Sequence, residues 1–443
     1  MANETKQKAP RRYEKMRDSG VEWIGMVPEH WQVRPVKAYY KIVTGFTPPS
    51  KQDDLYDDNG EIWVTISDMV TPIIKNSKQH ITVDYALTHI KEKVPKGSLL
   101  YSFKLSVGNV AIAGTELYTN EAIASFIPSD TISIPFLKYS SSLIVGNAVQ
   151  NIYGAAIMNQ QRILNAPIVF PPLSEQNIIA EYLEKKCKDI DIVIAEAKAS
   201  IEEYKAWKSS IIYEAVTKGL DSTAEMKDSG VEWIGKIPKH WGTTALKRIC
   251  KRISDGSHYS PPTTAFGLPY VTAGDIHGKG INYTKCRTIS KSDFDLLVKT
   301  NCQPHLGDVL LVKDGATTGR VGLMTDDGPC VLLSSVAMLT PNDGISSEYL
   351  MYLLESDVFQ YQIKKTMAGS AMPRTTLSKL MVYTAILCPF DEQVKIVNYL
   401  NAKCSHIEDL ISEKLSLISD LESYKKSLIY EVVTGKRNVL RKG

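Results

Sequence analysis

The chain has 443 residues, of which 43% are hydrophobic and 23% are charged, and its formal net charge is +3. This length predicts two or more domains, and the composition is typical of a globular protein with a buried core. No run of eighteen apolar residues occurs, which excludes a membrane-spanning helix, and the weak positive charge means that any nucleic-acid surface must be local. The seven cysteines are scattered without a CxxC pair, which predicts a reducing, cytoplasmic location and neither disulfides nor a metal site.

Two blocks of the sequence occur twice. The first occurs at residues 18–37 and again at 228–247, with twelve of twenty positions identical and a shared pattern WIG-x-x-P-x-HW. The second, residues 172–217, matches residues 389–434 at nineteen of forty-six positions, including a Glu-Gln pair near its start. Such a repeat predicts two half-units related by an approximate two-fold. The expected partner has the same approximate symmetry, and duplex DNA is the obvious candidate.

The segment after each copy of the first block has diverged but keeps a common pattern. Short β-branched or alternating runs lie between glycines, prolines and aspartates, which predicts β-strands joined by tight turns. Helical stretches such as 345–354 interleave with them, so each segment is expected to form a mixed α/β domain. The predicted strands include residues 62–66, 98–103, 168–170, 309–312 and 331–339.

Both copies of the second block predict a long helix. Ser174 and Asp391 stand two residues after a proline, where an N-cap is expected, and acidic residues follow in the first turn. Gly219 and Gly435 are expected to end the two helices.

Apolar residues recur every 3.5 residues from Leu183 to Ala215 and from Leu400 to Val432. This period over more than four heptads predicts a coiled coil, and the duplication makes its two helices antiparallel. The alternative is a pair of separate amphipathic helices, each packed on its own domain. Lys208, Lys414 and Lys425 interrupt the apolar seam and are expected to extend their amines to solvent.

The predicted fold class is therefore α/β (α+β), with two mixed domains joined by two long helices. The expected segments are a first mixed α/β domain at 1–171, a helix at 172–220, a second mixed α/β domain at 221–388 and a second helix at 389–443.

The sequence contains no recognisable catalytic motif. It has no GxxxxGK[ST] loop, no Asn-Pro-Pro-aromatic or Asp-Pro-Pro-Tyr tetrad of the amino-methyltransferases and no HExxH pair, so catalysis, metal and cofactor binding are not expected in this chain. His30 and His240 adjoin the duplicated tryptophans and are interpreted as structural residues. An architectural protein that binds two copies of a protein partner is the alternative to a DNA-binding protein.

The order of blocks closely resembles the specificity subunit of type I restriction-modification systems. The resemblance extends from about Tyr13 to Arg437, and its most specific marks are the duplicated tryptophan block and the duplicated Pro-x-x-Glu-Gln helix. It implies that each divergent domain recognises one half of a split, asymmetric DNA target. It also implies an antiparallel helical spacer that docks two modification (methyltransferase) subunits, with two further restriction (motor-nuclease) subunits in the assembly. S-adenosylmethionine would then bind to the modification subunits and not to this chain.

Polar residues in three loops of each domain are the candidates for DNA contact, because Arg, Lys, Asn and Gln suit base edges while Ser, Thr, Tyr and Lys suit phosphates. The four duplicated tryptophans are instead expected to pack each domain against the long helices. The candidates are Thr47, Lys51, Lys104, Ser106, Asn109, Gln160, Gln161 and Arg162 in the first domain, and Ser257, His258, Tyr259, Lys313, Thr317, Thr318, Arg320, Arg374 and Thr375 in the second.

Overall fold

The computed structural model describes residues 12–49, 52–89, 92–104, 106–150, 156–278, 280–326, 328–367 and 373–440. The chain folds into two units: unit 1 comprises residues 1–197 and 416–443, and unit 2 comprises residues 198–415. The division passes through both long helices rather than at their ends. Each unit therefore combines one divergent segment with parts of both helices.

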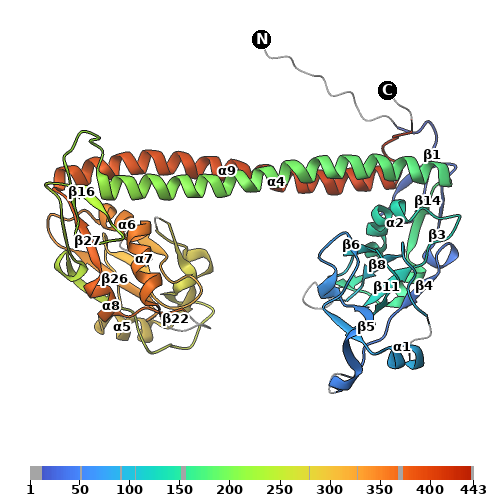
Figure 1. Cartoon of the computed structure of the whole chain (residues 1–443), viewed down its shortest axis with the longest axis horizontal. Helices are drawn as coiled ribbons and strands as arrows, with labels where there is room; N and C mark the ends of the chain where they lie inside the picture. The colour runs from blue at the N-terminus through green and yellow to red at the C-terminus, as the bar shows by residue number, and fades with distance from the viewer. Residues whose placement is uncertain are drawn as a thin grey trace, which may run out of the picture. The chain divides into compact units, whose positions relative to one another are not determined.

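Unit 1 is built on a five-stranded sheet, in the order β4-β11-β8-β9-β6, and a three-stranded sheet, in the order β10-β5-β7 (Figure 1). Neighbours in the larger sheet are antiparallel except β9 and β6. The pairs β1-β2, β3-β14 and β12-β13 are two-stranded. The elements are β1 (Met16–Asp18), β2 (Met26–Pro28), β3 (Gln32–Pro35), β4 (Ile42–Thr44), β5 (Tyr56–Val64), β6 (Ile73–Ile74), β7 (Gln79–Ile81), α1 (Val83–His89), β8 (Leu99–Ser102), β9 (Val110–Ala113), β10 (Tyr118–Thr119), β11 (Ile123–Phe126), α2 (Ile134–Ser140), β12 (Val149–Gln150), β13 (Ala156–Ile157), α3 (Gln160–Asn165) and β14 (Pro167–Phe170).

Unit 2 repeats this arrangement. Its four-stranded sheet, β18-β26-β23-β24, corresponds to β4-β11-β8-β9, and its three-stranded sheet, β22-β19-β25, corresponds to β7-β5-β10. These matching strand orders confirm the duplication and the mixed α/β class. The elements are β15 (Met226–Asp228), β16 (Lys236–Pro238), β17 (Gly242–Ala245), β18 (Cys250–Asp255), β19 (Leu268–Val271), β20 (Ile276–His277), β21 (Gly280–Ile281), β22 (Arg287–Ile289), α5 (Lys291–Lys299), β23 (Val309–Val312), β24 (Val321–Leu323), β25 (Val331–Leu332), β26 (Val336–Pro341), α6 (Ser347–Glu355), α7 (Asp357–Thr366), α8 (Leu377–Val382) and β27 (Thr384–Leu387).

The predicted strand at 331–339 is wrong as a single element. A turn in which Val336 N donates to Leu333 O (3.0 Å) divides it into β25 and β26. The two strands belong to different sheets, so one continuous apolar run supplies a core strand to each. Hydrophobic periodicity alone does not detect a turn of this kind, because the residues on both sides of it are buried.

Each sheet is covered by apolar side chains that exclude water. In unit 1, Leu99 and Tyr101 of β8 and Phe126 of β11 are fully buried. In unit 2, Leu311 of β23 and Leu339 of β26 are also fully buried. Burial of each such side chain contributes about 1.5–3 kcal/mol, which makes the sheet a stiff base for the loops at its edges.

Two long helices follow the divergent segments: α4 spans Leu173–Lys218 (46 residues) and α9 spans Phe390–Val433 (44 residues). Gly219 and Gly435 follow their last turns with φ of +75° and +73°. This left-handed conformation strongly favours glycine, so the sequence located both helix ends correctly.

The predicted N-caps are wrong by two residues. The carbonyl oxygens of Pro172 and Pro389 accept the first helical hydrogen bonds, so each proline is itself the N-cap residue. Ser174 and Asp391 lie inside the first turn. A proline can occupy this position because only its carbonyl group is needed there, and its missing N–H is not.

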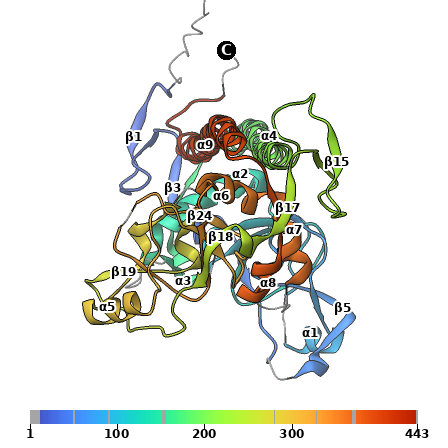
Figure 2. The same cartoon turned by 90° about the vertical axis from the view of Figure 1, so that its left-hand side faces the viewer.

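The seam predicted from the 3.5-residue period is confirmed. Its apolar positions are buried or half-buried along both helices. Figures 1 and 2 show α4 and α9 side by side. The alternative of two separately packed amphipathic helices is therefore wrong.

Two of the seam lysines form ion pairs between the helices, which corrects the expectation that they only extend toward solvent. In unit 1, Lys425 Nζ lies 2.6 Å from Asp191 Oδ1, and in unit 2, Lys208 Nζ lies 2.9 Å from Glu408 Oε1. Lys208 follows Asp191 along α4, whereas its partner Glu408 precedes Lys425 along α9. The two intervals contain the same number of residues. Both pairs therefore conform to one antiparallel register.

A Glu-Gln pair in the first turn of each long helix attaches that helix to its unit. We call the hydrogen bonds of these two side chains the helix-start contacts. In unit 1, Glu175 accepts hydrogen bonds from Trp31 Nε1 (2.9 Å) and is bonded to His30 Nε2 (2.8 Å). Gln176 is fully buried; its Oε1 accepts from Ser133 N (3.0 Å), the N-cap residue of α2. Its amide nitrogen donates to a backbone carbonyl, so both polar ends of the side chain are satisfied.

The same contacts recur in unit 2. Trp241 Nε1 donates to Glu392 (2.9 Å), His240 Nε2 is bonded to the same carboxylate (2.7 Å), and Gln393 Oε1 accepts from Ser346 N (2.9 Å). These contacts confirm the structural roles expected for the two histidines and for Trp31 and Trp241.

The other two tryptophans of the duplicated block contact the divergent segments. Trp23 packs closely on Gly146 of unit 1, and Trp233 packs on Tyr361 of α7 with a ring-centroid distance of 5.6 Å. Trp233 also packs against a core that includes Ile211 of α4 and Val397 of α9.

Reversing one charge of the unit 1 seam pair, by Lys425→Glu, places two carboxylates side by side at Asp191. We expect the free energy of unfolding to fall by about 1 kcal/mol, because both side chains are partly exposed. The double variant with Asp191→Lys should recover most of that loss. Chemical denaturation monitored by circular dichroism measures both values. Lys185→Glu, at an exposed position of α4, is the control; equal losses in the single and double variants would show that the pair contributes nothing.

Candidate nucleic-acid interface

The first candidate loop of unit 1 is shaped by Gly45, which follows β4. A Cβ atom at this position would lie 1.6 Å from Thr119 O, and Phe46 N donates to the same oxygen (2.9 Å). Only glycine allows two backbone segments to approach so closely. The loop is thereby pressed against the end of β10, and Thr47 is left exposed.

Two candidate segments of unit 1 meet at Glu121. Lys104, which follows β8, places its Nζ 3.3 Å from Glu121 Oε1, and the Thr47 hydroxyl donates to the other oxygen of the same carboxylate. The side chains of Lys104 and Glu121 are each 49% exposed. We call Thr47, Lys104 and Glu121 the Glu121 cluster. Sequence reasoning missed Glu121, since a single glutamate between two strands has no distinctive spacing.

The other candidates of unit 1 are not among the residues that meet at Glu121. Gln160 and Gln161 are exposed at the start of α3, and Ser106 is exposed after β8. Arg162 is held in place, because its Nη1 donates to Asn147 O (3.3 Å) and its own carbonyl accepts from Asn147 (2.7 Å). Lys51 lies outside the described residues.

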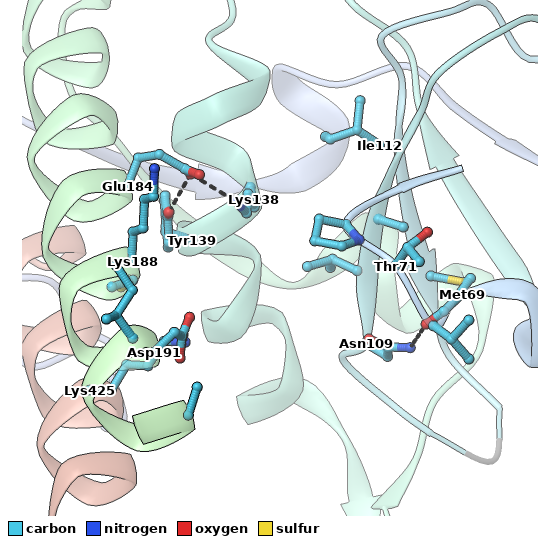
Figure 3. A pocket seen from close by; sticks show the side chains of 17 residues that line it. Met69, Thr71, Asn109, Ile112, Lys138, Tyr139, Glu184, Lys188, Asp191 and Lys425 are labelled. Atoms are coloured by element: carbon cyan, nitrogen blue, oxygen red, sulfur yellow. Dashed lines mark hydrogen bonds and ion pairs between the residues drawn. The ribbon is translucent and has the colours of Figure 1, made fainter. Parts of the chain in front are cut away.

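The Asn109 side chain is hydrogen-bonded within unit 1. Its Nδ2 donates to Met69 O (3.0 Å), which fixes the loop that contains Thr71 (Figure 3). This loop and β9 form one wall of a cavity of about 600 Å³ within unit 1.

The opposite wall of that cavity is formed by α2, α4 and α9. Lys138 (2.7 Å) and Tyr139 (2.6 Å) both donate to Glu184 Oε2, and these hydrogen bonds lower the pKa of the Glu184 carboxyl group (Figure 3). In unit 2, Tyr352 OH donates to Asn401 at the corresponding place (2.8 Å). The charged groups of this wall bind one another and attach α2 to α4, so we assign them to the scaffold.

The first candidate loop of unit 2 repeats the geometry of Gly45. A Cβ atom on Gly256 would lie 2.1 Å from Leu332 O, and Ser257 N donates to that oxygen (2.7 Å). Ser257 is buried, and its hydroxyl accepts from Tyr259 N (3.0 Å), which stabilises the turn. His258 and Tyr259 are exposed and border a cavity of about 540 Å³ beside the end of α5.

The structure brings three candidate segments of unit 2 together around two carboxylates. Lys313 is only 3% exposed, with Nζ 2.8 Å from Asp314 Oδ2 and 3.3 Å from Asp255 Oδ2. His258 Nε2 lies 3.4 Å from Asp255, and Arg374 Nε lies 3.2 Å from Asp314 Oδ1. We call these five residues the Asp314 cluster.

The remaining candidates of unit 2 stabilise the neighbouring turns. The Thr318 hydroxyl donates to Gly315 O (2.7 Å), and Arg320 Nη1 donates to Ile276 O (3.2 Å). Thr375 is fully buried, and its hydroxyl shares a hydrogen bond with Tyr383 (3.0 Å). Thr317 is half-buried in the same turn as Thr318.

Within the described ranges, no group of three or more His, Cys, Asp or Glu side chains is arranged to hold a metal ion. All seven cysteines are free thiols, and burial raises the pKa of Cys250 and Cys388 to about 12. Among the residues that the structure describes, no helix is both long and apolar enough to cross a membrane.

A family model described as the type I restriction modification DNA specificity domain matches residues 28–203 and 238–418. The chain belongs to this family. The two matches correspond to the two copies of the duplicated sequence, and they confirm the resemblance noted from the tryptophan and Glu-Gln blocks.

The curated relatives are named as specificity subunits of type I restriction enzymes. The MjaVIII specificity subunit of Methanocaldococcus jannaschii is 27% identical over 55% of this chain, and the EcoBI specificity subunit of Escherichia coli is 24% identical over 70% of it. A third, the putative MjaX specificity subunit of M. jannaschii, is 24% identical over 88% of this chain and 89% of its own length. The match covers about half the length of the MjaVIII and MjaIX subunits of M. jannaschii, 56% and 45%.

A solved structure shares the fold. A chain from a study of complex assembly and conformational transition of the type I restriction-modification system superposes with a TM-score of 0.67 at 17% identity, covering 92% of this chain and 99% of that chain. At this identity the likeness establishes the fold alone.

The two loop glycines provide a test of the site's geometry. Gly45→Ala and Gly256→Ala should each lower the free energy of unfolding by about 1–3 kcal/mol, because a methyl group there overlaps a backbone carbonyl oxygen. Gly242→Ala is the matched control, since a Cβ atom at Gly242 meets no atom within 4 Å. Chemical denaturation compares the three variants. Unchanged stability in both loop variants would contradict the close backbone approach.

Proposed function

We propose that the chain is the specificity subunit of a type I restriction-modification complex, in which each unit recognises one half of a split DNA target. The observation that carries this proposal is the pair of loop clusters. They stand on matching strands and matching glycines, yet they present different side chains. Equal scaffolds with unlike contact residues are suited to two half-sites of unlike sequence, so the target would be non-palindromic.

The DNA contacts would come from the exposed candidates. In unit 1 these are Thr47, Lys104 and Ser106 with the two glutamines of α3, and in unit 2 they are His258, Tyr259 and Arg374, with the half-buried Thr317 beside them. Lys104 would bind a phosphate in exchange for Glu121. An exposed ion pair contributes only about 0–1 kcal/mol, so a phosphate can replace the carboxylate at little cost.

The long helices would set the distance between the two half-sites. Domains that bind one face of a duplex need a separation near one helical turn, about 34 Å, and a stiff spacer suits that requirement better than a flexible linker. The unbroken α4 and the single register of the seam pairs support this role. The proposed sites lie in the divergent segments, which leaves helix surface for protein partners.

The chain would be non-catalytic and would act through its partners. Two modification subunits carrying S-adenosylmethionine would dock on the duplicated surfaces, and two restriction subunits would complete the nuclease form. The duplicated helix-start contacts support two equivalent docking surfaces. An architectural protein without DNA contacts, the alternative class, would not need unlike polar clusters on matching loops.

Methylome sequencing of cells that express this chain with its modification partner tests the proposed function. We expect one split motif with adenine methylated on both strands. Exchanging residues 40–170 for the matching segment of another family member should change one half of the motif and leave the other half unaltered. A continuous palindromic motif would contradict the proposal, and so would absence of methylation in a correctly assembled complex.

The Glu121 cluster gives a second test, on DNA affinity. Lys104→Ala should weaken binding of all sequences to a similar degree and reduce the salt slope by about one, as expected for loss of one phosphate contact. Glu121→Gln should strengthen binding, because it removes a carboxylate that competes with the phosphate. Fluorescence anisotropy at several salt concentrations measures both changes. Lys185→Ala on α4 is the control, and an unchanged affinity in both cluster variants would place the interface elsewhere.

A further inference from the structure

The backbone around Arg374 is hydrogen-bonded to the residues that follow β23. It forms an isolated antiparallel bridge with Asp314. On either side of this bridge, Gly315 N donates to Pro373 O (2.9 Å) and Thr375 N donates to Lys313 O (2.9 Å). A side chain that starts from such a fixed point loses less conformational entropy on binding than one in an unconstrained loop.

The Arg374 side chain is 61% exposed, and its Nε lies 3.2 Å from Asp314 Oδ1. A guanidinium group has five N–H donors, so the two terminal nitrogens keep four. No contact of these nitrogens with another described residue is found. Oδ1 of Asp314 is buried and receives no hydrogen bond within the described ranges, so Arg374 supplies the charge that it faces.

Asp314 is itself fixed by the buried amine of Lys313. The Lys313 side chain is only 4% exposed and lies between the carboxylates of Asp314 and Asp255. Separating this buried pair would leave an uncompensated charge, which is strongly unfavourable. Asp314 therefore cannot turn away, and it presents Oδ1 to the arginine in one direction.

This arrangement distinguishes the two arginines suggested by the sequence. Arg320 uses a terminal nitrogen on Ile276 O (3.2 Å), inside the turn that it stabilises. Arg374 instead places its Nε beside Asp314, and its terminal nitrogens form no hydrogen bond with another described residue. In unit 1, the N-cap Asn159 of α3 corresponds to the N-cap Thr376 of α8, which places Ile157 at the position of Arg374.

We propose that Arg374 recognises a guanine in the half-site bound by unit 2, donating from Nη1 and Nη2 to O6 and N7, and that Asp314 is its positioning residue. This inference rests on the proposed function. A planar donor pair matches the two acceptors on the major-groove edge of guanine and of no other base. The matching position of unit 1 is an isoleucine without a side-chain donor, so the same contact is absent from the other half-site.

The test uses the complete chain with its modification partner and compares methylation rates on DNA substrates that vary each position of the split motif. The half-site of unit 2, assigned by the exchange of residues 40–170, should contain a guanine. Arg374→Ala and Arg374→Lys should each reduce discrimination at that one position by about 5- to 150-fold and leave every other position unchanged. Arg374→Lys keeps the charge, so its effect isolates the planar donor pair.

Asp314→Asn should relax the same position by a smaller factor, because it removes the charge that orients Arg374. Arg248→Ala, at an exposed arginine elsewhere in unit 2, is the matched control and should alter nothing. Circular dichroism of each complex shows whether a variant remains folded. Where a variant does not fold, the motif of the wild-type complex still tests whether the half-site of unit 2 contains a guanine.

Several results would overturn the inference and leave the proposed function intact. They are a unit 2 half-site without guanine, a uniform loss of rate on all substrates with a reduced salt slope in Arg374→Ala, and full discrimination retained by Arg374→Lys. Full discrimination in Asp314→Asn would remove the positioning role of Asp314. A wild-type complex without a split motif would instead contradict the proposed function itself.

Discussion

The buried amide of Gln176 is the contact on which the position of the unit 1 loops depends. It joins the first turn of α4 to the first turn of α2, and it does so from a fully buried site. A buried donor or acceptor that loses its partner costs about 1–3 kcal/mol, so the amide tolerates only one placement of α2 on α4. Gln393 makes the same contact with α6 in unit 2. In both units the sheet, and with it the loops at its edge, inherits its orientation from the start of the helix.

This constraint explains which parts of the duplicated sequence have diverged. The tryptophan and Glu-Gln blocks contact each other, so a change in one requires a change in the other. The loops after Gly45 and Gly256 contact the scaffold mainly through backbone atoms. Their side chains can therefore differ between units without disturbing the strands. The Glu121 cluster and the Asp314 cluster are two such solutions on one backbone pattern.

Local patterns in the sequence predicted most of the fold but little of the site. Strands, helix ends and the seam follow from hydrophobic period and from glycine, which act over a few residues. The clusters depend on residues far apart in the chain, since Glu121 is 74 positions from Thr47 and 17 from Lys104. As a predicted DNA contact Lys313 would lie at the surface, but the structure buries it, although lysine is almost never fully buried. Its burial requires two carboxylates from different segments, and no spacing rule in a single sequence connects them.

If the proposed interface is correct, the clusters would let a weakly basic chain bind DNA selectively. Lys104 and Arg374 each face a carboxylate of their own unit, so neither adds a full uncompensated charge to the surface. Non-specific affinity for DNA comes almost entirely from phosphate neutralisation. A surface whose basic side chains are paired with carboxylates therefore has a low non-specific affinity. In the proposed complex, base edges of the target would accept hydrogen bonds from donors that the carboxylates leave free. The acidic partners would thus raise the ratio of specific to non-specific binding, the quantity that decides whether a half-site is found among many competing sequences.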